Sequence, residues 1–152
     1  MTDFREYRAS DRERCLAIFD SNTPRFFAPN ERQDYVDFLA AVPSAYEVCV
    51  LRDHVVGAFG VTGSKSTPRG DAVRLQWILV DPTAQGQGVG RAVMERVLEA
   101  ARLILGRAGG HVDIAASHLS APFFVRFGAV EIARIENGWG PEMHRVDMEM
   151  PV

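Results

Sequence analysis

The chain has 152 residues, of which 47% are hydrophobic and 24% charged, and it carries a formal net charge of −3. These values are typical of one globular domain, and they exclude collagen-like, coiled-coil and disordered classes. The sequence holds one lysine, Lys65, and no run of basic residues, so we do not expect a nucleic-acid partner.

Nothing in the sequence indicates a membrane or an oxidising compartment. No apolar run approaches the roughly 18 residues that a membrane-spanning helix requires. The charged start, MTDFREYRAS, does not resemble a secretory signal. Two cysteines, Cys15 and Cys49, are too few for a disulfide framework. We therefore expect a cytoplasmic protein without a membrane partner.

The first third of the chain predicts one strand and two helices. A short strand comes first, at 3–9. Ser10 is the expected N-cap of the first helix, with Glu13 as its capping-box partner, and this helix fades at 21–24. A second helix follows at 30–42, where apolar residues recur at helical spacing.

The middle of the chain predicts three strands. Apolar, β-branched residues at 45–51 and 55–62 form the two arms of a hairpin around the tight turn 52–54. Polar residues with Gly and Pro at 63–71 indicate a loop. The segment 72–80, AVRLQWILV, is the strongest strand candidate in the chain.

The last third begins with a long amphipathic helix at 88–106, whose polar stripe lies opposite an apolar one. The elements that follow are a strand at 111–116, a helix at 119–127, a strand at 129–136, a turn at Asn137-Gly138 and a strand near 143–150.

This order, β-α-α-β-β-β-α-β-α-β-β, predicts an α/β fold of the mixed α+β type, with a central mixed sheet flanked by helices. We expect a single domain that covers 1–152. The strand–helix–strand unit at 72–116 is expected to be parallel, with a right-handed crossover.

The segment 85–91, with the sequence QGQGVGR, lies between a buried strand and the long helix. Its glycines allow a ligand to approach the backbone closely. The first N–H groups of a helix are unpaired and carry the positive end of its dipole. Such a turn is typical of an anion site, in particular for a pyrophosphate. A tight turn without a ligand is the alternative, since Gly-rich turns are common.

Two other phosphate-binding loops do not fit this segment. The dinucleotide fingerprint G-x-G-x-x-G would need a glycine at the position of Arg91. A Walker A loop would need a GK[ST] sequence, and the chain has none.

The residues Gln85-Gly86-Gln87-Gly88-Val89-Gly90 match the Q/R-x-x-G-x-G/A signature of the GCN5-related N-acetyltransferase (GNAT) superfamily. They stand where that family has them, after the fourth strand and at the start of the third helix. The segment 123–129, FFVRFGA, is similar to the family's F-Y-x-K/R-x-G-F stretch. The chain thus resembles a GNAT enzyme over its whole length, which implies the GNAT fold and transfer of an acetyl group from acetyl-CoA to an amine.

The resemblance also implies a CoA site. The backbone N–H groups of the turn would hold the pyrophosphate, Leu79 and Val80 would offer backbone groups to the pantetheine arm, and the Val80 N–H would point at the thioester carbonyl. Ser117 would lie beside the pantetheine, and Arg126 would meet the CoA phosphates. The implied set is Leu79, Val80, Gln85, Gly86, Gln87, Gly88, Val89, Gly90, Arg91, Ser117, Phe124 and Arg126.

The chain departs from the family at the usual acid–base pair. Many members have a glutamate base at the start of the fourth strand, where this chain has Arg74, and the common tyrosine acid of the fourth helix is Phe124. His118 is the candidate proton acceptor, with a polar helix-start residue as the alternative. A water held by Ser117 or Ser120 is the expected proton donor. The candidate catalytic positions are His118, Ser120 and Phe124.

Candidate acceptor-binding residues come from two connections. Arg25, Phe26 and Phe27 lie between the first two helices, a connection that GNAT acceptor sites commonly use. Trp139 and His144 lie in the last hairpin, which flanks the acceptor pocket in this fold. The alternatives are that the two phenylalanines cap the core and that His144 is a solvated surface residue.

No histidine and carboxylate show the spacing of metal ligands, so we expect no metal. The acceptor is a small-molecule or peptide amine that the sequence leaves open, and a homodimer is compatible with the family. The absent acid–base pair keeps a second function open, a CoA-binding sensor or scaffold without transferase activity. Another Gly-rich nucleotide-binding protein is the third candidate.

Overall fold

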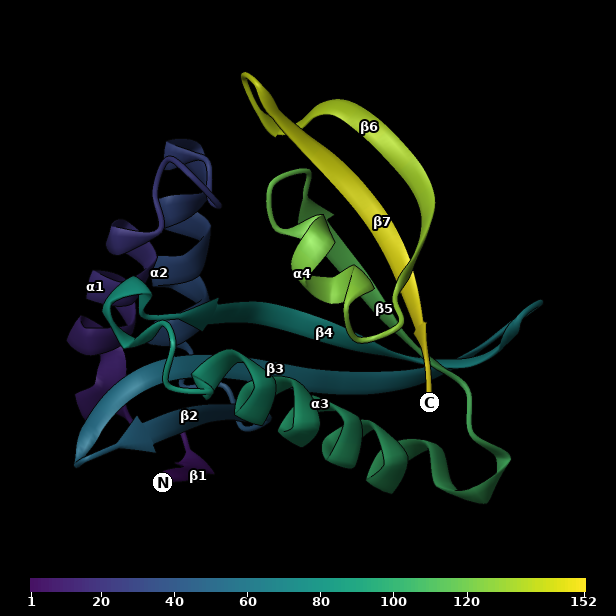
Figure 1. The fold of residues 1–152 in the computed structure, drawn as a ribbon, viewed down its shortest axis with the longest axis horizontal. Helices are drawn as coiled ribbons and strands as arrows, with labels where there is room; N and C mark the ends of the chain where they lie inside the picture. Colours follow the sequence, from purple (N-terminus) through teal and green to yellow (C-terminus); the bar gives the residue numbers. More distant parts are fainter.

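The computed structural model describes the backbone of residues 1–152 and every side chain except that of Ser64. Seven strands form one sheet in the order β1-β2-β3-β4-β5-β7-β6 (Figure 1). The strands are β1 (Thr2–Glu6), β2 (Tyr46–Leu51), β3 (His54–Thr67), β4 (Gly70–Val80), β5 (His111–Ser117), β6 (Val130–Gly140) and β7 (Met143–Pro151). The helices are α1 (Arg12–Ser21), α2 (Arg32–Ala40), α3 (Val89–Leu105) and α4 (Ala121–Val125).

The predicted mixed sheet with flanking helices is confirmed. Neighbouring strands are antiparallel except β4 and β5, which pair in parallel as the segment 72–116 predicted. In the part of the chain that the structure describes, no helix combines the length and the apolar character that crossing a bilayer needs.

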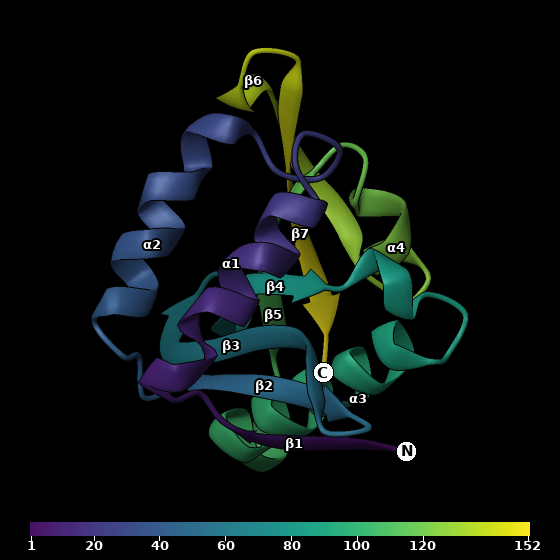
Figure 2. The same cartoon turned by 90° about the vertical axis from the view of Figure 1, so that its left-hand side faces the viewer.

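The helices bury the two faces of the sheet in separate apolar cores. On one face, α3 packs its apolar stripe, which includes Val93 and Val97, against β3, β4, β5 and β7. On the other face, α1 and α2 bury Phe19 and Tyr35 in a cluster rich in aromatic rings. Figure 2 shows α1 and α2 on the opposite side of the molecule from α3 and α4.

The first helix begins later than the sequence predicts. A 3-10 turn at Ala9–Asp11 precedes α1, and the carboxylate of Asp11 accepts the N–H of Arg8 at 2.9 Å. Arg5 holds the same carboxylate through two hydrogen bonds of 2.8 Å. The prediction of Ser10 as N-cap is therefore wrong, because the 3-10 turn shifts the N-cap position of α1 to Asp11, whose carboxylate binds back to Arg8 and makes no capping hydrogen bond to the helix.

Two segments that the sequence predicts as a loop and a turn belong to β-strands in the structure. β3 and β4 leave only Pro68-Arg69 as a turn, so most of 63–71 belongs to a long hairpin arm that extends past β5 (Figure 1). β6 continues through Asn137-Gly138, and its turn lies at Pro141-Glu142. These segments lack apolar alternation because they lie outside the two cores.

Candidate functional site

A cavity of about 1150 Å³ lies where β4 and β5 separate. The two strands pair only from Ala72 to Arg74 on β4, opposite 111–113 on β5, and then diverge (Figure 1). The cavity is lined by the end of β4, the Gly-rich turn, the end of β5, α4, the α1–α2 connection and the β6–β7 hairpin. The free edges of two strands, a helix start and two connections therefore face one space.

A β-bulge reshapes the end of β4. Two residues, Trp77 and Ile78, lie opposite Phe59 of β3, and Trp77 has a φ of 43°. The Tyr46 hydroxyl donates to the carbonyl of Trp77 at 2.5 Å and so satisfies it. The extra residue reverses the faces of the strand, because Leu75 packs in the core of α3 whereas Trp77 packs in the core of α1 and α2.

The bulge is followed by a strand edge that faces the cavity. The N–H of Asp81 donates to the Val56 carbonyl of β3 at 2.7 Å. Since backbone directions alternate along a strand, the N–H and C=O of Val80 point away from β3. Asn22 donates to that C=O at 3.0 Å, and β4 has no pairing strand beyond Arg74 on this side. The Val80 N–H is thus available to a ligand.

Leu79 does not match its expected role. It pairs with Ala58 of β3, so the same alternation turns its backbone polar groups into the sheet. Its side chain is 3% exposed and packs in the core of α1 and α2. Leu79 is among the residues that line the cavity, but its backbone groups pair with β3, so of the two residues expected to offer backbone groups only Val80 has them free.

The Gly-rich turn forms an open cradle at the start of α3. Gly86 and Gly88 have φ values of 79° and 78°, and a Cβ built at either would meet no atom within 4 Å. The first helical hydrogen bond runs from the Ala92 N–H to the Gly88 carbonyl. The N–H groups of residues 89–91 therefore have no partner within the helix and suit an anion.

Three residues of the turn behave differently from the rest. The Gln85 N–H is used, since it donates to the Pro82 carbonyl at 3.3 Å, and Gln87 does not line the cavity. Gly90 has a packing role, because a Cβ there would approach the Phe123 ring to 3.1 Å. At the turn, the backbone of Gly86 and of 88–91 therefore forms the cavity wall.

Charged groups support the turn from both sides. Arg91 and Arg126 line the cavity, and the Arg126 guanidinium lies 5.5 Å from the centre of the Phe123 ring. Asp81 anchors the turn through a hydrogen bond from the Thr83 N–H (2.9 Å) and an ion pair with Arg14. Burial of Asp81 raises its pKa, but these donors outweigh burial and hold the pKa below its usual value.

The wall formed by β5 and α4 offers few exchangeable protons. Ser117, Ser120 and Phe124 line the cavity as expected. The Ser117 hydroxyl donates to the Ser120 hydroxyl at 3.0 Å, which in turn donates to the Ser117 carbonyl at 3.2 Å. Each hydroxyl already donates within the protein, so neither serine proton is free for the substrate, and the water expected at Ser117 or Ser120 stays a prediction.

The two candidate histidines lie outside the cavity. The rings of His118 and His144 are 4.7 Å apart between centroids, and neither lines the cavity wall. The His144 N–H donates to Nδ1 of His118 at 3.1 Å, and the Asn137 N–H donates to Nδ1 of His144 at 3.0 Å. Each Nδ1 must stay unprotonated to keep its bond. The structure therefore does not support the roles expected for these two residues.

Aromatic side chains close the end of the cavity between α1 and the β6–β7 hairpin. Phe26, Phe27 and Trp139 line it as predicted, and Trp77 joins them from the bulge. The Trp139 indole N–H donates to the Ala116 carbonyl at 2.9 Å. The expectation for Arg25 is corrected, because this exposed side chain stacks on the outer Phe26 ring at 4.9 Å and does not line the cavity.

Glu31 is the lining residue that sequence reasoning misses. It follows Pro29-Asn30 before α2, is only 8% exposed and faces the cavity. Its neighbours in the sequence give no sign of burial, since polar residues at a helix start are ordinarily solvated. The signal that was available is Pro29 followed two positions later by an acid, which marks a helix start but not a cavity.

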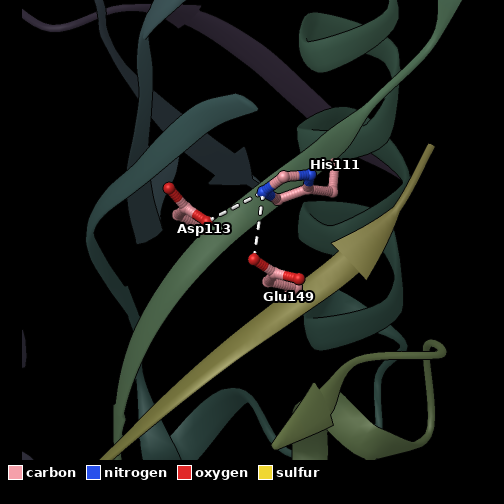
Figure 3. Close-up of side chains that lie close together, drawn as sticks. All are labelled: His111, Asp113 and Glu149. Carbon is pink, nitrogen blue, oxygen red and sulfur yellow. Dashed lines mark ion pairs between the residues drawn. The ribbon is translucent and has the colours of Figure 1, made fainter. Parts of the chain in front are cut away.

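A second cluster of titratable side chains lies near the closed end of β5 (Figure 3). Nε2 of His111 lies 3.1 Å from Asp113 and 3.3 Å from Glu149 of β7, a group with the chemistry of metal ligands. Sequence spacing does not reveal it, because Glu149 comes from another strand. Both carboxylates already pair with cations, Lys65 at 3.5 Å and Arg69 at 2.7 Å, so the cluster holds the β3–β4 arm against β5 and β7.

Comparison with known proteins gives a family. A family model described as an acetyltransferase (GNAT) domain matches residues 44–128. This range contains the bulged strand, the Gly-rich turn and α4. A comparison with curated proteins finds no match.

Solved structures share the fold over the whole chain. Ard1 from Thermoplasma volcanium is 19% identical, with a TM-score of 0.78, 99% of this chain and 97% of that chain covered. A GCN5-related N-acetyltransferase from Kribbella flavida is 17% identical, with a TM-score of 0.75 and coverage of 99% and 98%. The ribosomal-protein-S18-alanine N-acetyltransferase from Escherichia coli is 17% identical, with a TM-score of 0.72 and coverage of 100% and 94%. At these identities the likeness shows the fold.

Proposed function

The chain belongs to the GNAT acetyltransferase family and is an acyltransferase, and from that premise we propose that it moves an acetyl group from acetyl-CoA to a primary amine. The amine attacks directly, within a complex that holds both substrates. The observation that carries this proposal is a single cavity with unpaired backbone N–H groups at one end and an aromatic pocket at the other.

The Gly-rich turn fits the pyrophosphate of CoA. The N–H groups of residues 89–91 and the helix dipole attract an anion, and the open space beside Gly86 and Gly88 leaves room for it. Arg91 and Arg126 add positive charge at the same end of the cavity. The backbone N–H groups and the two arginine side chains would together hold the two phosphates.

The free edge of β4 fits the pantetheine arm. An extended chain laid along this edge would pair with β4 as an additional strand does. The Val80 N–H then lies where it can donate to the thioester carbonyl and stabilise the negative charge that develops on its oxygen. Acetyl-CoA supplies an activated acetyl group whose thiolate leaves readily, with a pKa that resembles the value of about 8.5 for cysteine.

A CoA-binding sensor or scaffold without transferase activity is the second candidate. Arg74 stands where many GNAT enzymes have the glutamate base, Phe124 has no hydroxyl, and the protons of Ser117 and Ser120 are used. Loss of a general acid typically lowers a rate by about 10²–10⁴, which leaves measurable turnover. We therefore favour the enzyme.

The two candidates differ in their products. Incubation with acetyl-CoA and a panel of amines should give acetylated amine and free CoA in equal amounts, measured by mass spectrometry and thiol titration. Binding of CoA without either product would favour the sensor. Displacement of CoA by ATP or NAD at similar concentrations would instead indicate a general nucleotide-binding protein.

A further inference from the structure

We propose that Glu31 binds the ammonium group of the acceptor and takes its proton, and that the acceptor is a monoamine carried by an apolar group of aromatic size. This inference rests on the proposed function and names the substrate class of the same site. It places the proton acceptor on the connection between α1 and α2, whereas the family pattern would place it at the start of β4, where this chain has Arg74.

The carboxyl group of Glu31 is held at one oxygen and open at the other. Oε2 accepts the N–H of Ala28 at 2.7 Å. Among the described residues no group donates to Oε1, and Oε1 is not one of the unpartnered polar atoms sealed from solvent. Glu31 lines the cavity, and Oε1 is the oxygen that no described group occupies.

No cation of the described residues forms an ion pair with Glu31. Asp34 of α2 adds negative charge nearby, and β6 presents the backbone carbonyl of Trp139, which accepts from Asn30, and the backbone of Gly140 to this connection. The cations carried by the surrounding elements have other contacts: Arg32 with Asp20 at 2.8 Å, Arg25 over Phe26 at 4.9 Å, Arg145 with Asp147 at 2.7 Å and over Trp139 at 5.3 Å. Arg74 lines the cavity from β4.

The surroundings make this carboxyl a proton acceptor that works near neutral pH. Burial raises the pKa of Glu31 to about 7, with the Ala28 N–H opposing the rise and Asp34 adding to it. A general base is most effective when its pKa lies near the working pH. An ammonium group beside Oε1 would supply the counter-charge that the protein itself does not.

The step balances with the groups already named. The Glu31 carboxylate takes one proton from the ammonium, and the nitrogen lone pair then forms the new bond to the acetyl carbon. The carbon–sulfur bond breaks, and the second proton lost by the nitrogen passes to the CoA thiolate. The products are the amide, CoA thiol and a protonated Glu31, which returns its proton to solvent.

The lining of the pocket selects the acceptor. The rings of Phe26, Phe27, Trp77 and Trp139 offer apolar surface and the negative faces that attract a cation. Glu31 is the one carboxylate among the described residues that line the cavity. A second ammonium group would therefore be buried without a carboxylate to neutralise it, which disfavours diamines.

The substrate half of the inference is tested with two amines of similar reach. We expect kcat/KM for 2-phenylethylamine to exceed that for 1,4-diaminobutane by at least about tenfold, which corresponds to one unpaired or lost contact of modest strength. Equal values, or a preference for the diamine, would overturn the assignment of an apolar monoamine.

The catalytic half is tested with Glu31→Gln, which keeps an acceptor for the Ala28 N–H and removes the charge. We expect kcat/KM for the amine to fall by about 100-fold near neutral pH, and the rise of activity through a pKa of about 7 to disappear. Near pH ~10 a sizeable fraction of an alkylamine, whose pKa is close to the ~10.4 of lysine, is neutral before it binds, so the variant should recover part of the wild-type rate. Asp37→Asn, an exposed carboxylate of α2, is the matched control and should change neither profile.

A measurement of acetyl-CoA affinity distinguishes a failure of the Glu31 assignment from a failure of the proposed function. Glu31→Gln should bind acetyl-CoA as the wild type does, which also shows that it folds. If the wild type acetylates amines and Glu31→Gln keeps the wild-type rate and pH profile, the assignment of Glu31 fails and the proposed function stands. If the wild type binds acetyl-CoA and acetylates no amine, the proposed function fails and the assignment of Glu31 fails with it.

Discussion

The two ends of the cavity are built by different means. The end proposed for CoA is made of backbone, namely the N–H groups of 89–91 and the free edge of β4 at Val80. The end proposed for the acceptor is made of side chains that meet from three separate segments, with Glu31, Trp77 and Trp139 as examples. A site built from backbone depends on local conformation, whereas one built from side chains depends on how distant segments pack.

This difference predicts how the two ends respond to substitution. Changes in the turn should alter CoA affinity through backbone geometry and leave amine selectivity intact. Changes in the aromatic pocket should alter KM for the amine and leave CoA affinity intact.

Gly88→Val should have the largest effect on CoA. A β-branched residue at a φ of 78° is strained, and relief of that strain would move the turn away from its anion-binding shape. We expect CoA affinity, measured by calorimetry, to fall by about 10- to 100-fold. Gly88→Asn tolerates the left-handed region and should bind nearly as the wild type does. A wild-type CoA affinity in Gly88→Val would contradict the proposal that CoA binds at this turn.

Glu31→Gln should stabilise the protein above neutral pH. The folded-state pKa of about 7 lies above the ordinary value of 4.5, so the contribution of this carboxyl to stability is present below 4.5 and is lost as the pH rises through 7. Glutamine avoids that loss. We expect a gain of about 1–3 kcal/mol in the free energy of unfolding near pH ~8, and none near pH ~4. A gain that is equal at both pH values would contradict the burial of a charged carboxylate.

Trp139→Ala should raise KM for the amine by about tenfold and leave the acetyl-CoA Kd nearly unchanged, because the indole lines only the acceptor end. Trp139→Phe keeps a ring without the hydrogen bond to the Ala116 carbonyl and serves as the control. Parallel loss of both affinities would mean that Trp139 holds the hairpin in place and does not contact the acceptor.

Phe124→Tyr should have the smallest effect. The ring is 4% exposed and lines the cavity, so a hydroxyl there can donate to the departing thiolate. We expect a gain in kcat of about two- to fivefold below neutral pH, where an unassisted thiolate leaves poorly. Ser120→Ala should not change kcat, because the serine proton is bonded to the Ser117 carbonyl. The opposite pattern would return the proton donor to the serines.

The sequence predicts the backbone end far better than the side-chain end, for a physical reason. The Gly-rich turn and the amphipathic α3 are adjacent in the chain, so their pattern is local. Phe26, Phe27 and Trp139 could be predicted only through the family resemblance. Glu31 could not be predicted, because nothing in its neighbourhood indicates that Trp139 and Gly140, more than 100 positions away, lie against the connection that carries it.

The sequence pattern does not predict which backbone groups of β4 face the cavity. The segment 72–80 carries polar residues only at Arg74 and Gln76 and is apolar from Trp77 on, so the sequence does not show which of the residues after Gln76 is the extra one of the bulge. Leu79 and Val80 both line the cavity, but only the backbone groups of Val80 point away from β3. His118 and His144 show the same limit, since their partners are backbone N–H groups that only the folded chain brings within reach.

The most direct test of the account is a map of backbone amide shifts, measured by nuclear magnetic resonance, as CoA is added to the protein. The account predicts that the largest changes fall on the amides of Val80 and of 89–91, with Leu79 and the His118–His144 pair little affected. The same amides should respond far less to ATP or NAD at equal concentration. Changes confined to other parts of the chain, or none at Val80 and 89–91, would contradict the placement of CoA in the cavity between β4 and β5.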